Sequence, residues 1–173
     1  MGRARSMSRP CNAPRIVVGV DRSFAGMQAL RRAVQLARRD GAQLDAVRAW
    51  VFAPTWRPGT LTWRWQDECD QAALAYLRGV FDAALGGQPR DVPVRLVATQ
   101  GYAGQVLVDH AHRESDLLVV GSPERRRFGG SHGHVTRYCV TRAAVPVVAV
   151  PAPSWARAAT IRRFARDLER FSR

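Results

Sequence analysis

The sequence predicts a single α/β domain, with a doubly wound, five-stranded parallel sheet and helices on both faces. Five short apolar segments rich in β-branched residues alternate with four segments whose apolar residues recur every three or four positions. Such alternation requires right-handed crossovers and a parallel sheet that helices cover on both sides. With 173 residues, 46% hydrophobic and 24% charged, the chain is long enough for one such domain with a full core.

The first expected strand is Arg15 to Val20, RIVVGV, because a continuous β-branched run is typical of a strand buried on both faces. Ser23 is the expected N-cap of the helix that follows, and Gly41 ends that helix. Its apolar face consists of Met27, Leu30, Val34 and Ala37. Asp21 lies between the strand and the helix, where a carboxylate can cap the helix or contact a ligand.

The second strand is expected at residues 43–51 and the second helix at residues 66–85, which Gly86 and Gly87 close. Between them lies a predicted loop, Phe52 to Trp65, with three of the five tryptophans, Trp56, Trp63 and Trp65. Two interpretations of these tryptophans remain: a lid or base-stacking surface over a binding site, or aromatic cover for a core edge or a dimer face.

The remaining pattern repeats strand and helix to the end of the sheet. The expected elements are a strand at 94–99, a helix at 103–113, a strand at 117–120, a helix at 135–142 and a strand at Val147–Val150. The expected strand order is 3-2-1-4-5. In such a sheet a ligand binds outside the carboxyl ends of the strands, here near Asp21 and Gly121.

The formal net charge is +13, and all 27 basic residues are arginine. Residues 1–15 contain four arginines and no acid, and residues 154–173 contain six arginines and two acids. The rest of the chain is therefore only mildly basic, which argues against a fold that binds nucleic acid as a whole. We expect a disordered basic tail over residues 1–14.

A basic amphipathic helix is expected over residues 152–173, after the prolines that follow the last strand. Its apolar residues, three or four apart, are Ile161, Phe164, Leu168 and Phe171. Two interpretations stand: the helix binds an anionic surface or a partner groove, or its apolar face packs against its own domain.

Several site classes are not indicated. Cys11, Cys69 and Cys139 are widely spaced and form no Cys-x-x-Cys pair, so neither a disulfide framework nor a cysteine zinc site is expected. Neither a signal peptide nor a membrane span is expected, because the necessary apolar runs are absent from the sequence. These features predict a cytoplasmic protein.

No catalytic or metal centre is expected. Ser131 lies in a G-x-S-x-G pattern, but eight residues separate Gly121 from Gly130, whereas a nucleophile elbow joins strand and helix directly. The pairs His110 and His112, and His132 and His134, lack the additional ligands of a metal site. Since no carboxylate pair or Walker-type lysine is present either, we expect a protein that is not an enzyme.

Three stretches, IVVGVDRS, DLLVVGS and AAVPVVAV, occur in an order and spacing that resembles the universal stress protein (UspA-like) domain, over residues 15–151. The resemblance implies a Rossmann-like fold of the adenine nucleotide alpha hydrolase type and a non-enzymatic, cytoplasmic role in stress response. It also implies a homodimer, which would use Val147–Val150 as its edge strand.

In the nucleotide-binding branch of that family, the resemblance implies that Asp21 contacts the nucleoside and Leu44 the adenine. The family's phosphate motif is Gly, two residues, Gly, nine residues, Gly, then Ser or Thr. Gly121 and Gly133 occupy the first and third glycine positions, whereas Glu124 replaces the middle glycine. His134 replaces the Ser or Thr, and the loop is one residue short.

Glu124 is unfavourable there in two ways. If the position needs a positive φ, a Glu there is strained by ~1–2 kcal/mol. In addition, a carboxylate at about 4 Å from a bound phosphate repels that phosphate by up to ~4 kcal/mol before solvent screening. Arginine forks from Arg125, Arg126 and Arg127 can offset this, with Gly130 giving the loop freedom. A solvated charge run is the other interpretation of these arginines.

ATP is therefore the expected ligand, at a modified phosphate loop. The competing interpretation is a nucleotide-free interaction module of the same fold. It would act through dimerisation and its basic tails on a partner protein or nucleic acid.

Overall fold

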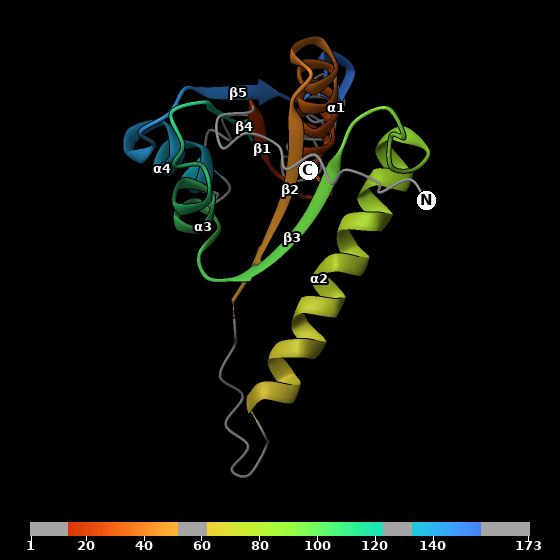
Figure 1. The fold of residues 1–173 in the computed structure, drawn as a ribbon, viewed down its shortest axis with the longest axis vertical. Coiled ribbons are helices and arrows are strands. Elements are labelled where there is room, and N and C mark those ends of the chain that lie inside the picture. Colours follow the sequence, from red (N-terminus) through yellow and green to blue (C-terminus); the bar gives the residue numbers. More distant parts are fainter. Residues whose placement is uncertain (1–13, 52–61, 123–132, 157–173) are drawn as a thin grey trace, which may run out of the picture.

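The computed structural model describes residues 14–51, 62–122 and 133–156 (Figure 1). One five-stranded parallel sheet contains β1 (Arg15–Gly19), β2 (Gln43–Trp50), β3 (Val94–Gln100), β4 (Asp116–Ser122) and β5 (Val147–Pro151). The strand order is β3-β2-β1-β4-β5. The predicted α/β class and strand order are both confirmed.

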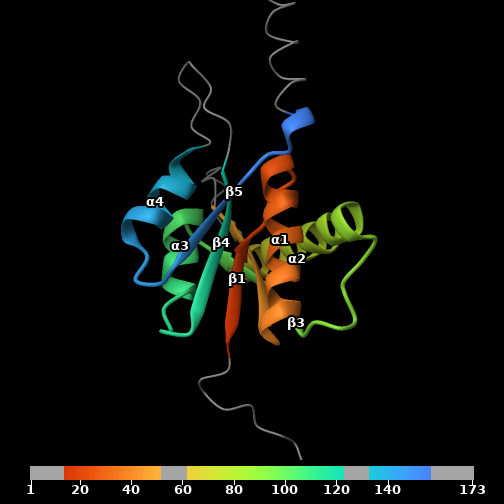
Figure 2. The same ribbon diagram turned by 90° about the horizontal axis from the view of Figure 1, so that it is seen from above.

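Two layers of helices cover the sheet. The helices are α1 (Phe24–Asp40), α2 (Thr62–Leu85), α3 (Ala103–His110) and α4 (His134–Arg142). Figure 2 shows α1 and α2 on one face and α3 and α4 on the other. Alternate residues of β1 face each side: Ile16 and Val18 pack under α1 and α2, while Val17 packs under α3 and α4.

Local signals place the ends of α1 where they were expected. The Ser23 hydroxyl accepts a hydrogen bond from the Gly26 amide, as an N-cap does. Gly41 ends the helix with φ 60°, a left-handed conformation that glycine adopts without steric cost.

Several element boundaries differ from the prediction by one or two residues, and two differ by more. The second helix begins at Thr62 instead of Gln66, because the last helix breakers of the preceding segment are Pro58 and Gly59. The third helix ends at His110 instead of Arg113, since Ala111 leaves helical geometry with φ −92° and ψ 74°. The fourth strand begins at Asp116, whose Cα is paired with that of Arg15.

The segment after β5 turns back onto the start of α1. A short helical stretch begins at Ser154, and the rings of Trp155 and Phe24 meet edge to face with centroids 4.9 Å apart. Ala156 is buried. The rest of the helix predicted over residues 152–173 lies outside the described residues, as do residues 1–13 of the predicted basic tail.

Among the predicted loop tryptophans, Trp65 is an exposed residue of α2. Trp56 and the side chain of Trp63 lie outside what the structure describes. None of the helices in the described ranges combines the length and hydropathy that crossing a membrane requires.

Candidate functional site

Asp21 follows the carboxyl end of β1 and is exposed. Its Oδ1 accepts hydrogen bonds from the Ser23 amide at 2.9 Å and from the Ser23 hydroxyl at 2.5 Å. The Ser23 hydroxyl oxygen in turn accepts from the Gly26 amide at 2.9 Å. One carboxylate oxygen of Asp21 thus orients the cap of α1. Within the described residues, the other oxygen has no hydrogen-bond partner and remains available to a ligand.

Gly121 lies at the carboxyl end of β4, next to the first turn of α1. A Cβ at this position would lie 2.7 Å from the carbonyl carbon of Ala25 and from the amide nitrogen of Gly26. The Gly121 carbonyl accepts a hydrogen bond from Thr136 Oγ1 at 2.8 Å. Glycine is therefore required here for close packing of β4 on α1, whether or not a ligand binds.

Gly133 and His134 begin α4. Gly133 is its N-cap with φ −90°, makes no side-chain cap and has space for a Cβ. His134 lines an open groove of about 580 Å³ between α3 and α4. The other lining residues are Tyr102, Ala103, Gly104, Gln105, Val135, Arg137, Tyr138, Thr141 and Arg142. Two arginines and two tyrosines thus share this groove with His134.

The rest of the predicted phosphate loop lies outside the described residues. This applies to Glu124, Arg125, Arg126, Arg127 and Gly130. Their role in holding phosphate remains a prediction. Ser131 and His132 lie in the same segment.

Leu44 does not lie at this edge of the sheet. It is fully buried and pairs with Ile16 near the amino end of β1. Asp21 is five residues further along, about 16 Å at the rise of a strand. The structure therefore does not bring together the two residues expected to hold the nucleoside, and the contact of Leu44 with adenine stays a prediction. The Val20 amide donates to the Val47 carbonyl, so Arg48 lies beside the end of β1 instead.

A cluster of Arg22, Arg48 and Tyr76, absent from the sequence-based prediction, occupies the α2 side of this edge. The guanidinium carbon of Arg22 lies 4.9 Å from the centre of the Tyr76 ring, and that of Arg48 lies 4.2 Å from it. The Arg22 amide donates to the Tyr76 hydroxyl at 2.8 Å. The sequence carries no signal for these contacts, because Arg22 and Tyr76 are 54 residues apart.

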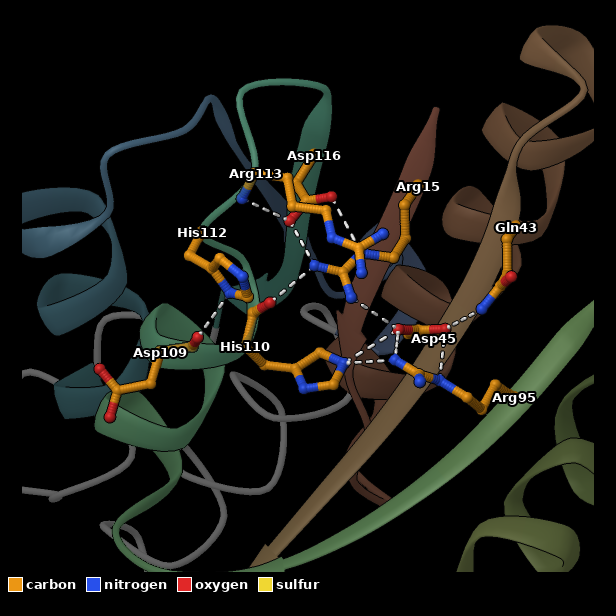
Figure 3. A network of polar contacts seen from close by, with 9 residues as sticks. All are labelled: Arg15, Gln43, Asp45, Arg95, Asp109, His110, His112, Arg113 and Asp116. Atoms are coloured by element: carbon orange, nitrogen blue, oxygen red, sulfur yellow. Dashed lines mark hydrogen bonds and ion pairs between the residues drawn. The ribbon is translucent and has the colours of Figure 1, made fainter. Parts of the chain in front are cut away.

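The opposite, amino edge of the sheet carries a buried polar network (Figure 3). Arg15 donates to Asp116 through two nitrogens, at 2.9 and 2.5 Å, and to Asp45 at 3.2 Å. Asp45 also accepts from Arg95, and it pairs with the His110 ring nitrogen at 2.9 Å. The network joins the starts of β1, β2 and β4 to the end of α3.

Charge compensation keeps these buried carboxylates ionised. Burial raises the pKa of Asp45, whereas hydrogen bonds from His110, Arg95 and Gln43 together lower it by more. The resulting pKa is well below the usual value. For Asp116 burial likewise raises the pKa, but hydrogen bonds from the Arg15 side chain and the Arg113 amide, together with the charges of these two arginines, lower it by more in total. The geometry is that of a structural ion cluster. Among the described residues, no group of three or more His, Cys, Asp or Glu side chains is arranged to hold a metal ion.

Comparisons with known proteins agree with this fold. Residues 13–151 match the model of the Universal stress protein family. A universal stress protein from Mycolicibacterium smegmatis is 30% identical over 138 residues, 78% of this chain and 45% of that protein. The chain thus spans about half the length of this relative.

Solved structures are similar across most of the chain. Universal stress protein UspA from Lactobacillus plantarum has a TM-score of 0.59 at 23% identity, covering 82% of this chain and 99% of that one. A universal stress protein in complex with cAMP has a TM-score of 0.55, also at 23% identity, covering 81% and 98%. The family match over residues 13–151 decides the assignment: the chain belongs to the universal stress protein family.

Proposed function

We propose that this protein is a cytoplasmic, non-enzymatic stress-response protein that binds an adenine nucleotide, ATP in particular, at the carboxyl edge of its sheet. The observation that carries the proposal is the arrangement of Asp21 and Gly121. Both lie against the first turn of α1, and one Asp21 oxygen has no partner among the described residues. This is the edge at which doubly wound sheets bind ligands.

Related proteins support the class of ligand. Solved universal stress proteins of this fold include one in complex with cAMP, one from Archaeoglobus fulgidus in complex with dAMP and one from Arabidopsis thaliana with AMP bound. An adenine nucleoside offers ribose hydroxyls that can donate to the Asp21 carboxylate, and its phosphates suit arginine forks and the amino end of α4. The site supplies binding groups, and the proposed role is binding without turnover.

Asp21→Asn tests this use of the carboxylate. The amide oxygen of asparagine still accepts from Ser23, so the cap is kept while the charge is lost. We expect calorimetry to show about tenfold weaker ATP and adenosine binding, a loss of ~1.4 kcal/mol. The control is Asp109→Asn, which makes the same charge change on an exposed residue near the far end of α3. Equal affinities for the parent and Asp21→Asn would contradict the assigned role.

A second candidate is the nucleotide-free interaction module, which the edge position of β5 favours. Within the described residues β5 pairs with β4 alone, so its other side presents unpaired backbone groups. We propose a homodimer joined through Val147–Val150, and an anionic partner for the basic segment after it. Absence of nucleotide from the purified protein, together with no ATP binding in calorimetry, would favour this candidate over the first.

A further inference from the structure

Arg22 and Arg48 converge on Tyr76 from two different elements. Arg22 belongs to the turn after β1, and Arg48 to the carboxyl half of β2. Both guanidinium groups lie over the Tyr76 ring, and Arg48 also donates to the Val20 carbonyl at 3.4 Å. The Tyr76 ring on α2 therefore holds two cations at the carboxyl edge of the sheet.

Gly79 makes room for one of these cations. It lies one turn after Tyr76 in α2, and a Cβ there would come within 3.0 Å of Arg22 Nη2. Glycine in a helix interior lowers helix stability relative to alanine. Its presence here lets the Arg22 guanidinium lie along the helix.

The two guanidinium groups have no carboxylate partner in the described ranges. Other arginines do pair with acids: Arg38 with Asp91, Arg39 with Asp40 and Arg95 with Asp45. Two cations on one ring repel each other, and a bound anion relieves this repulsion. Arg22 and Arg48 also retain most of their five N–H donors each.

We propose that Arg22, Arg48 and Tyr76 form a binding site for a phosphoryl anion carrying at least two negative charges. A tetrahedral phosphoryl group offers oxygens in several directions, so it can accept from two guanidinium forks at once. The Tyr76 hydroxyl accepts from the Arg22 amide and keeps its own proton to donate. The site does not depend on nucleotide binding through Asp21. Its phosphoryl group comes either from a free anion or from a nucleotide at the adjoining edge.

Titration with pyrophosphate tests the site directly. In the full chain we expect saturable calorimetric binding, with shifts of the amide resonances of Arg22 and Gly79. Arg22→Gln combined with Arg48→Gln should weaken binding by about tenfold or more, because each removed guanidinium takes charge-assisted hydrogen bonds with it. The matched control is Arg32→Gln with Arg78→Gln, which removes the same charge from exposed positions.

A charge-neutral variant separates the site from general electrostatics and from misfolding. Gly79→Ala makes the Arg22 Nη2 give by a few tenths of an ångström while favouring the helix, so pyrophosphate affinity should fall slightly without a lower melting temperature. Two results would each overturn the proposal: no saturable binding by the parent, or an equal loss in the Arg32 and Arg78 control.

ATP and adenosine then identify the source of the phosphoryl group. If the Arg22 and Arg48 double variant weakens ATP but not adenosine, the nucleotide's own phosphates reach the cluster. If it weakens pyrophosphate alone, the cluster holds a separate anion. Both results support the site. If ATP binding is lost in Asp21→Asn, while the double variant of Arg22 and Arg48 binds ATP and pyrophosphate as the parent does, only the nucleotide proposal is supported.

Discussion

Gly121 of β4 lies against Gly26 of α1 so closely that a Cβ on Gly121 would be 2.7 Å from the Gly26 amide nitrogen. The contact joins the end of one strand to the first turn of the helix whose cap Asp21 orients. A glycine that the sequence suggested for phosphate binding is therefore needed first for packing. Stability measurements can separate these two roles.

Gly121→Ala should destabilise the fold. The added methyl group meets backbone atoms, which cannot swing aside as a flexible side chain does, and such overpacking typically costs ~1–3 kcal/mol. Gly133→Ala is the control, since a Cβ there meets nothing within 4 Å. Urea denaturation of both variants measures the difference. Equal free energies of unfolding would refute the packing role of Gly121.

Asp45→Asn should be strongly destabilising. Arg15 and Arg95 would lose a fully buried counter-charge, and breaking a buried pair costs ~3–5 kcal/mol. The exposed pair of Arg38 and Asp91 supplies the control, because Asp91→Asn should change stability little. A thermal melt of Asp45→Asn that matched that of Asp91→Asn would contradict the structural role of the network.

The pH dependence of stability has a definite sign. Asp45 and Asp116 have folded-state pKa values below their unfolded values, so the unfolded chain binds more protons in acid. Their contribution is complete above the unfolded value near pH 4 and is lost as the pH falls below it. Melting temperatures from pH 7 to pH 3 should fall in that window, and less steeply for Asp116→Asn. A parallel fall in both proteins would show that other carboxylates dominate.

Dimerisation through β5 is tested by light scattering. The chain has a mass of 19.2 kDa, and we expect twice that mass at micromolar concentrations. Ala149→Lys, at an exposed position of the edge strand, should favour the monomer because a charge at a sheet edge opposes pairing. A parent protein that is monomeric throughout this range would remove the edge-pairing proposal.

Much of the fold follows from local chemistry. The cap Ser23 and the terminator Gly41 act on their own neighbours, so the sequence was sufficient to place α1. The site depends on contacts between distant residues, such as Arg22 with Tyr76, and no local pattern encodes them. In the sequence, Asp45 is a single charged residue within an apolar strand. Pairing of the strands is what brings Arg15 and Arg95 next to it and compensates its charge.

The placement of Leu44 shows a different limit. Family resemblance placed the adenine contact early in the second strand, whereas the parallel register puts that residue at the amino edge beside Ile16. Ligand contacts come from the other end of the strands. Strand register, which depends on pairing across the whole sheet, determines this position of Leu44.

Calorimetric titration of the parent and Glu124→Gly with ATP tests the central proposal most directly. Replacing Glu124 removes a negative charge from the predicted phosphate loop and any strain from a positive φ. We expect measurable ATP binding by the parent and an affinity at least about tenfold higher in the variant, a gain of ~1.4 kcal/mol. No detectable ATP binding by either protein would contradict it.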